Sequence, residues 1–260
     1  MTSPYGGSAG YYQQGRLPYP SQLADRLIDA VPAAAGGRLL DIGCGPGRFT
    51  RVVADRFASV VGVDADPGMI ERARAAGIPH ARFLHRSAEE LPGDLGGFDL
   101  VTFALSFHWL DQQRVTRAAY DLLEPGGACV HVHAWSLRGD PVVGGRPLPP
   151  YDAVSAVLDG YLGPERRLAH ATPGEEAEPM RAAGFVGPAV VLVPGGEVVT
   201  STIDDLVARS YSTSGATPER LGGRQADAER ELRQVLADAT SDGRFDEQLR
   251  DARLAVWHRP

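Results

Sequence analysis

The segment from Leu39 to Gly47 constrains the fold of this chain more than any other part of the sequence. It reads LLDIGCGPG, an apolar run that leads directly into a turn with three glycines, and a second apolar segment, residues 58–63, ends at Asp64. In a parallel α/β sheet, ligands bind at the carboxyl ends of the strands, where glycines let the backbone come close. A carboxylate that ends the next strand can accept hydrogen bonds from both hydroxyls of a ribose. The two segments therefore predict a site for a nucleoside-bearing cofactor.

Details of the turn distinguish between classes of cofactor. A dinucleotide site follows the pattern G-x-G-x-x-G, in which the third glycine lets the helix pack closely on the strand. Here the third position is Arg48, and Pro46 removes an N–H group that could hold a phosphate. Asp41 would repel a diphosphate but attract an ammonium group. S-Adenosylmethionine (SAM) carries an α-ammonium group and no phosphate, so the turn favours SAM over a nicotinamide cofactor. The pairing of Asp41 with Asp64 disfavours a turn that binds no ligand.

Hydrophobic patterning alternates between strands and helices along the first half of the chain. This alternation predicts parallel strands with helices on both faces of the sheet. Residues 1–20 have no periodicity and on their own would be interpreted as a disordered tail. The expected strands are 38–42, 60–64, 81–86, 98–104, 128–134, 185–194 and 254–258. The expected helices are 21–31 with Ser21 as its N-cap, 47–57, 66–76, 111–123, 151–162, 176–183 and a broken stretch from 203 to 240.

Length, charge and cysteine content exclude several classes of protein. The 260 residues suffice for one large α/β domain with its own core. A net charge of −7 without a basic run argues against a general nucleic-acid binder. No apolar run approaches the length of about 18 residues that a membrane span needs, and no secretory segment is visible, so we expect no membrane partner. Cys44 and Cys129 do not make a disulfide framework, which predicts a cytoplasmic protein.

Further motifs stand at the places where one family of enzymes has them. The sequence has SAEELP at 87–92, FDLVT at 98–102, SFHWLD at 106–111 and LLEPGG at 122–127. With D-x-G-x-G-x-G at 41–47 and with Tyr12, Gly15, Arg16, Tyr19 and Pro20 near the N-terminus, the chain resembles the class I SAM-dependent methyltransferases. It is most similar to their small-molecule branch, which includes ubiquinone/menaquinone- and trans-aconitate-methyltransferase-like enzymes. The match is specific over residues 36–134, and the remainder agrees only in layout.

The resemblance implies the fold and its division along the chain. We expect a doubly wound α/β fold with a seven-stranded, mostly parallel sheet in the order 3-2-1-4-5-7-6, strand seven antiparallel, and helical lid insertions. Residues 1–260 would form a single class I methyltransferase domain. Within it, 1–35 are the N-terminal lid and helix, 36–134 the SAM-binding half, and 135–183 and 197–245 the insertions that build the acceptor pocket.

The resemblance also implies which residues contact SAM. Asp41 would organise the turn and the ammonium group, and Asp64 would bind the ribose. Ser87 stands where an Asp is frequent, and its hydroxyl can still bond the adenine amine without a charge. Core packing is the alternative for Met69, and a helix cap is the alternative for Glu89. The expected cofactor-binding residues are Tyr12, Arg16, Asp41, Gly43, Gly45, Asp64, Ala65, Met69, Ser87, Ala88, Glu89 and Ala104. Tyr12 and Arg16, with Tyr11 and Tyr19, would belong to a segment that folds over the cofactor.

His108 is the candidate catalytic residue, because it follows the fourth strand at the mouth beside the reactive methyl group. Histidine is the usual general base near neutral pH. Methyl transfer depends chiefly on positioning and exclusion of water, so a pocket-shaping role for His108 stays open and is slightly favoured. His131 and His133 alternate on the fifth strand, but they lack a partner set, and no metal is expected. The expected substrate-binding residues are Trp109, His133, Trp135, Tyr151 and Tyr211.

Different functions remain compatible with a SAM site. The first is methyl transfer to O, N or C of a small-molecule acceptor, as in specialised metabolism. Enzymes that methylate nucleobase amines carry an Asp/Asn-Pro-Pro-aromatic motif after strand four, where this chain has Ala104-Leu105-Ser106-Phe107. We therefore expect no nucleic-acid partner. We also expect the protein to be a monomer or a homodimer. A macromolecule-directed (protein or RNA) methyltransferase and a catalytically silent SAM-binding partner protein are the alternatives.

Overall fold

The computed structural model describes residues 5–91, 94–166 and 174–260. It divides the chain into two compact units, each assembled from three segments. The sheet unit comprises Tyr19–Ala134, His170–Pro194 and Asp251–Pro260. The helical unit comprises Met1–Pro18, Trp135–Ala169 and Gly195–Arg250.

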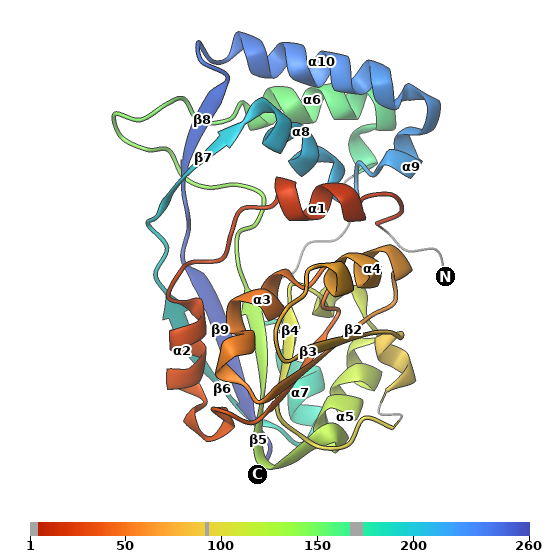
Figure 1. Ribbon diagram of the computed structural model, residues 1–260, viewed down its shortest axis with the longest axis vertical. Helices are drawn as coiled ribbons and strands as arrows, with labels where there is room; N and C mark the ends of the chain where they lie inside the picture. The colour runs from red at the N-terminus through yellow and green to blue at the C-terminus, as the bar shows by residue number, and fades with distance from the viewer. Residues whose placement is uncertain (1–4, 92–93, 167–173) are drawn as a thin grey trace. The chain divides into compact units, whose positions relative to one another are not determined.

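The sheet unit is built on seven strands, of which one, β9, is antiparallel to both neighbours. In spatial order the strands are β3 (Ala81–His85), β2 (Ser59–Asp64), β1 (Arg38–Ile42), β4 (Phe98–Ala104), β5 (Leu123–His133), β9 (Ala252–His258) and β6 (Val186–Val193) (Figure 1). When only the strands of this sheet are numbered, the order is 3-2-1-4-5-7-6 with an antiparallel seventh strand. The predicted fold class is therefore confirmed.

Helices cover both faces of this sheet because successive strand residues point to opposite sides. Leu39 of β1 packs into one core and Leu40 into the other, and both side chains are fully buried. The first core takes residues from α2 (Leu23–Ala30), α3 (Arg48–Val53) and α4 (Pro67–Ala75). The second takes residues from α5 (Gln112–Leu122) and α7 (Ala177–Ala183). Short 3-10 turns lie at Pro32–Ala34, Ala54–Arg56, Ala88–Glu90 and Phe107–Trp109.

The carboxyl ends of the parallel strands meet at one edge of the sheet and position the candidate site. β1 continues into the glycine turn, β2 ends at Asp64, β4 ends at Ala104 and β5 ends at His133. Asp66 begins α4 by accepting the backbone N–H groups of Gly68 and Met69, and Asp111 caps α5 through the N–H of Arg114. These two caps, which the sequence predicts, determine where α4 and α5 begin after the edge of the sheet.

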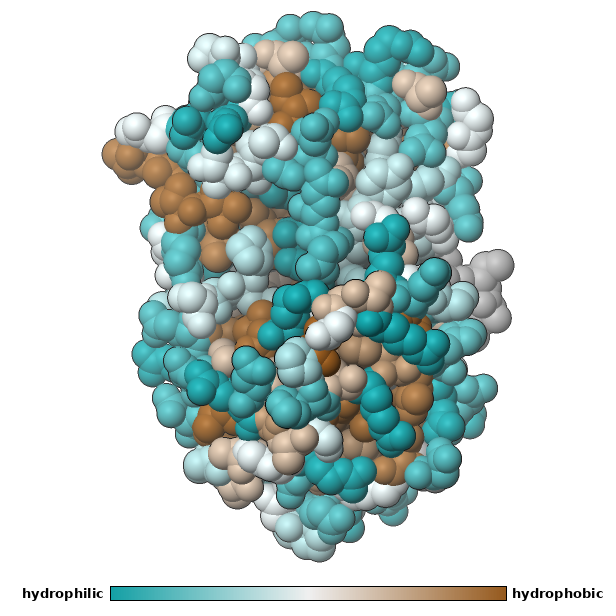
Figure 2. All heavy atoms as spheres, in the orientation of Figure 1, coloured by the Kyte–Doolittle hydropathy of each residue, from teal (hydrophilic) through white to brown (hydrophobic). Residues whose placement is uncertain are grey.

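The helical unit packs several helices and a small sheet around its own core. Its helices are α1 (Ala9–Gly15), α6 (Tyr151–Leu162), α8 (Ile203–Tyr211), α9 (Pro218–Leu221) and α10 (Gln225–Asp238), with 3-10 turns at Pro164–Arg166 and Gly222–Arg224. β7 (Val198–Thr202) and β8 (Arg244–Gln248) form a separate antiparallel pair. Tyr211, Leu232 and Phe245 are fully buried in this core. Figure 2 shows hydrophobic side chains gathered over the loop that precedes α6, where Val143 is fully exposed.

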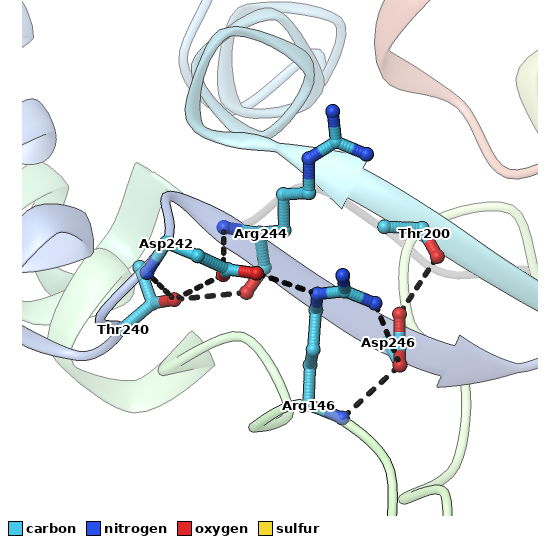
Figure 3. A network of polar contacts seen from close by, with 6 residues as sticks. All are labelled: Arg146, Thr200, Thr240, Asp242, Arg244 and Asp246. Atoms are coloured by element: carbon cyan, nitrogen blue, oxygen red, sulfur yellow. Dashed lines mark hydrogen bonds and ion pairs between the residues drawn. The ribbon is translucent and has the colours of Figure 1, made fainter.

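A polar network joins that loop to β8 and β7 (Figure 3). Arg146 donates its Nε–H to Asp242 at 2.8 Å and its backbone N–H to Asp246 at 3.0 Å. The other oxygen of Asp246 accepts the hydroxyl of Thr200 at 2.7 Å. One carboxylate thus links the loop, β8 and β7, which positions the start of α6 within this unit.

Several elements differ from the expectation. α2 begins after Gln22 without a side-chain cap, so Ser21 is not its N-cap. Residues 9–15, which show no periodicity in the sequence, form α1, and neither β7 nor β8 was expected. Over the described ranges, no helix combines the length and the apolar character that a membrane crossing requires.

Candidate functional site

The glycine turn after β1 brings the backbone close to its neighbours at one position and leaves it open at another. Gly43 and Gly45 both have positive φ, at 70° and 54°. A Cβ at Gly43 would lie 2.4 Å from the Cβ of Ser106, whereas a Cβ at Gly45 would meet no atom within 4 Å. Gly43 is therefore required by packing. Gly45 borders open space, which a ligand can fill while touching the backbone.

Asp64 connects this turn to the start of α4. Its Oδ2 accepts the N–H of Gly45 and its Oδ1 accepts the N–H of Asp66, both at 2.9 Å. Burial raises the pKa of Asp64, and the two N–H donors oppose that rise. Each oxygen keeps a further lone pair, so the carboxylate can still accept hydroxyl groups from a ligand beside Gly45.

Asp41 is fully buried beneath the turn. Its two oxygens accept the hydroxyls of Thr50 at 2.7 Å and Thr102 at 3.1 Å. Burial raises its pKa from 3.8 to about 6, although both hydroxyls lower it. Both oxygens of the Asp41 carboxylate therefore have hydrogen-bond partners within the fold. When ionised, the carboxylate places a negative charge close to the glycine turn.

The residues expected near an adenine lie after β2 and β3. Met69 is buried on α4, and Ala65 accepts the Nε2–H of His85 through its carbonyl at 3.0 Å. The Ser87 hydroxyl caps the turn at Ala88–Glu90 and bonds the Glu89 carboxylate. Burial raises the pKa of Glu89, but hydrogen bonds from the Ser87 hydroxyl and from the N–H of Asp111 together lower the pKa by more, so the net shift is downward. Ser87 and Glu89 thus have structural partners here, and their contact with a cofactor stays a prediction.

The chain that follows β4 is held tightly against the glycine turn. Leu105 has a φ of 59°, a left-handed conformation that costs a non-glycine residue about 1–2 kcal/mol. Its N–H bonds the carbonyl of Val132 at 3.2 Å, and the Ser106 hydroxyl donates to the carbonyl of Ile42 at 2.6 Å. This chain segment, which includes His108, forms one wall of a small cavity whose lining also includes His131, His133, Glu175 and Glu176.

Two of the cavity histidines differ in their surroundings. His131 is buried between the rings of Phe103 and Phe107, with centroids 5.0 and 4.5 Å away, and burial lowers its pKa to about 3. His133 is half-buried, and its Nε2 lies 4.0 Å from Oε2 of the fully buried Glu176. His131 is therefore a packed, neutral core residue, whereas His133 faces a charged partner.

Glu176 also pairs with an arginine from the last strand. Its Oε1 lies 3.6 Å from Nη1 of Arg253, and its Oε2 accepts the N–H of Gly174 at 2.8 Å. Among the described residues, Glu176 Oε1, Arg253 Nη1 and the Nε2 atoms of His131 and His133 are buried without a hydrogen-bond partner. The same residues include no group of three or more His, Cys, Asp or Glu side chains suited to a metal ion.

Five of the expected site residues belong to the helical unit. The Arg16 guanidinium donates to Ser212 and to the Ser136 hydroxyl and lies over the Tyr12 ring, 4.6 Å from its centroid. Tyr211 is fully buried in the core of that unit, and Trp135 is 58% exposed beneath Arg250. Tyr151 accepts a hydrogen bond from Arg209 through its hydroxyl. The sheet unit thus brings together the predicted turn, ribose and cavity residues, and the roles of these five stay predictions.

Three residues at this cavity or beside the turn, Glu176, Arg253 and Ser106, were not predicted from the sequence. Ser106 stands in a motif that was singled out for its neighbours His108 and Trp109. Glu176 and Arg253 come from distant segments, and no local pattern marks either of them.

Comparisons with known proteins agree with this geometry. Residues 39–127 match the family described as a methyltransferase domain. An uncharacterized methyltransferase of Mycobacterium tuberculosis is 39% identical over 140 residues, which are 54% of this chain and 55% of that protein. The trans-aconitate 2-methyltransferase of Deinococcus radiodurans is 34% identical over 110 residues, 41% of this chain and 42% of that protein. The chain thus matches about half the length of these curated relatives.

Solved structures confirm the fold. A candidate methyltransferase from Bacillus halodurans aligns with a TM-score of 0.52 at 21% identity, covering 92% of this chain and 99% of that one. The [4+2]-cyclase SpnF aligns with a TM-score of 0.51 at 19% identity, over 92% and 81% of the two chains. Since a cyclase shares the fold, the fold by itself does not decide the reaction.

Proposed function

Because this chain carries a methyltransferase domain on a class I sheet, we propose that it transfers a methyl group from SAM to a small-molecule acceptor. One observation carries the proposal. Open space borders Gly45, and the Asp64 carboxylate, which accepts the N–H of Gly45, lies beside that space. The ribose of a nucleoside can lie against the backbone of a glycine such as Gly45, and its hydroxyl groups can donate hydrogen bonds to the adjacent Asp64 carboxylate.

The residues present also fit the charge of SAM. Asp41 and Asp64 place two carboxylates around the turn, and repulsion from Asp64 adds to the rise in the pKa of Asp41 that burial chiefly causes. A cationic ligand relieves that repulsion, whereas a diphosphate adds to it. Met69 and Ala88, both buried near the ends of β2 and β3, are our candidates for the adenine contact.

SAM, when bound, supplies an electrophilic methyl group on a sulfonium. The part left to the protein is to orient the acceptor, exclude water and, for some acceptors, remove a proton. His108, His131 and His133 all line the cavity next to the turn, and Ser106 contacts both the turn and the cavity. We therefore propose that the acceptor binds beside the side chains that line this cavity.

A small-molecule acceptor is favoured over a nucleic acid by the net charge of −7. Two relatives are named for their acceptors: the trans-aconitate enzyme and, at 31% identity over 49% of this chain and half of its own length, a malonyl-[acyl-carrier protein] O-methyltransferase of Enterobacter lignolyticus.

Calorimetry with SAM and with NAD tests the proposal. We expect SAM to bind with micromolar affinity, about −8 kcal/mol, and NAD not to bind. Asp64→Ala should weaken SAM binding by about 2 kcal/mol or more, the scale of lost hydrogen bonds to a charged group. Asp55→Ala removes an exposed carboxylate elsewhere and should leave binding unchanged. Tight binding of NAD with none of SAM would refute the proposal.

A further inference from the structure

We propose that two copies of this chain form a homodimer in which their β6 strands pair antiparallel across a two-fold axis, so that one sheet continues from copy to copy. The surface concerned is the outer edge of β6, the strand that ends the seven-stranded sheet (Figure 1). This inference does not depend on the proposed function, because it uses only residues of the sheet unit that are distant in sequence from the glycine turn.

The outer edge of β6 is both unpaired and apolar. β9 pairs with one side of β6, and among the described residues no strand pairs with the other side. The backbone N–H and C=O groups of such an edge are a template for a further strand. Val186, Val190 and Leu192 are 62%, 50% and 61% exposed. In a single copy, β6 therefore presents backbone hydrogen-bonding groups and large apolar side chains to solvent together.

The edge strand at the other end of the same sheet is protected, and β6 is not. β3 exposes Arg82 and His85 and buries its one aromatic side chain, Phe83. Charged side chains on an edge strand oppose pairing with further strands. β6 reads VGPAVVLV and contains no charged residue. This contrast within one sheet indicates that the β6 edge is covered by an apolar partner, whereas the β3 edge is kept exposed.

The regular part of β6 is complementary to itself, which identifies the partner as a second copy. The register with β9 shifts between Val186 and Ala189, so residues 189–193 form the regular stretch. A two-fold axis at Val191 places Val190 of one copy opposite Leu192 of the other, and the same pair recurs across the axis. Opposite residues of an antiparallel pair point to the same face and touch. The four exposed side chains thus close into one apolar cluster.

The elements beside β6 have to take part in such an interface. Five strand residues span only about 17 Å. A specific, stable interface buries about 800 Å² on each partner, which the edge of one short strand does not supply. α2 and α7 pack against β6 from opposite faces of the sheet, since they belong to different cores. Continuing the sheet through the axis brings these helices next to their copies in the partner.

α7 has the charge pattern that a two-fold contact needs. Glu178 and Arg181 are exposed and three residues apart, so they lie on the same side of the helix. The Arg181 guanidinium lies over the Trp257 ring, 5.7 Å from its centroid, and this contact holds it beside β9. A two-fold axis perpendicular to the sheet reverses the direction of α7 in the partner. The acid of one copy can then pair with the base of the other.

Light scattering and analytical ultracentrifugation test the dimer. We expect the wild-type protein to have the mass of two chains at micromolar concentrations. Val190→Lys places two charges in the apolar cluster and should give a monomer. Val143→Lys is the matched control, because it changes an exposed valine of the helical unit, and it should stay dimeric. A monomeric wild type, or a dimer that Val190→Lys leaves intact, would overturn the proposal, as would a dimer that only Val143→Lys dissociates.

A charge exchange on α7 tests the contact between the helices. Arg181→Glu gathers acids at the axis and should weaken dimerisation about tenfold. Adding Glu178→Arg to this variant restores one acid and one base on each copy, so dimerisation should recover. A purely local role of Arg181 against Trp257 would not be rescued by the second change. Dimerisation that stays as weak in the double variant as in Arg181→Glu would refute the placement of α7 at the contact.

Hydrogen exchange of the unmodified protein locates the interface without any variant. Backbone N–H groups of residues 189–193 should exchange more slowly in a concentrated solution than in a dilute one, because pairing with the second copy protects them. Residues 81–85 of β3, at the other edge, are the control and should exchange equally in both. Exchange in β6 that does not change with protein concentration while the mass of the protein does would overturn the proposal.

Discussion

At the scale of single residues, Asp41 makes the stability of the protein depend on pH. Its pKa is about 6 in the folded chain against 3.8 for a free carboxyl, because burial opposes its charge. The folded state therefore holds the proton more tightly than the unfolded state between these two values. The resulting contribution to stability is fully present below about pH 4 and is lost as the pH rises through 6.

We expect Asp41→Asn to remove this dependence. At about 1.4 kcal/mol per pKa unit, the wild type should lose about 3 kcal/mol relative to the variant between pH 3 and pH 7. Denaturant unfolding of both proteins across this range measures the difference, and Asp55→Asn, at an exposed site, is the control. Parallel stability curves for wild type and Asp41→Asn would show that Asp41 ionises as easily in the folded chain as in the unfolded one.

His108 is the residue for which two roles stay open, and its replacement separates them. If His108 shapes the pocket, as we favour, His108→Ala should raise KM severalfold while the pH dependence of kcat stays unchanged. If it is the base, kcat should fall about 100-fold or more and the acid side of the pH profile should disappear. Steady-state kinetics over pH 5 to 9 distinguish these results. A normal KM with a flattened profile would contradict our preference.

At the scale of elements, the glycine turn should respond differently to the same change at two positions. Gly45→Ala faces open space, so its folding cost is that of the positive φ, about 1–2 kcal/mol. The added methyl group would occupy the space proposed for SAM, and we expect binding to weaken at least tenfold. Gly43→Ala, which would collide with Ser106 at 2.4 Å, should destabilise the fold more strongly. Thermal unfolding and calorimetry on both variants provide the test, and equal effects on binding and stability would contradict it.

Elements were predictable from the sequence where the signal is local. β1 and β4 have the expected bounds because each is a compact apolar run with a turn signal behind it, and α4 begins at the expected Asp66 cap. β7 and β8 were missed because neither is apolar throughout and each is stabilised by pairing with the other. In the site, the turn and Asp64 are local patterns. The Glu176 and Arg253 pair depends on three-dimensional packing of distant segments, which one sequence does not reveal.

At the scale of the whole molecule, we expect the cofactor to bind to the sheet unit, because that unit contains the glycine turn and Asp64. Saturating SAM, at about 100 times its dissociation constant, should stabilise the folded protein by about 2.7 kcal/mol. Hydrogen exchange should then slow most in the glycine turn and at the ends of β2 and β4. Slowing confined to the helical unit would place the ligand elsewhere.

The position of β9 has a consequence for how the protein is made. Residues 252–258 are synthesised after both of the strands that they pair with, so β5 and β6 each have an unpaired inner edge until β9 has left the ribosome. Open strand edges are templates for pairing with other chains. Until β9 pairs, the sheet therefore remains vulnerable to misassembly. Chaperone demand and yield during expression should thus depend strongly on how readily residues 252–258 insert between the two strands.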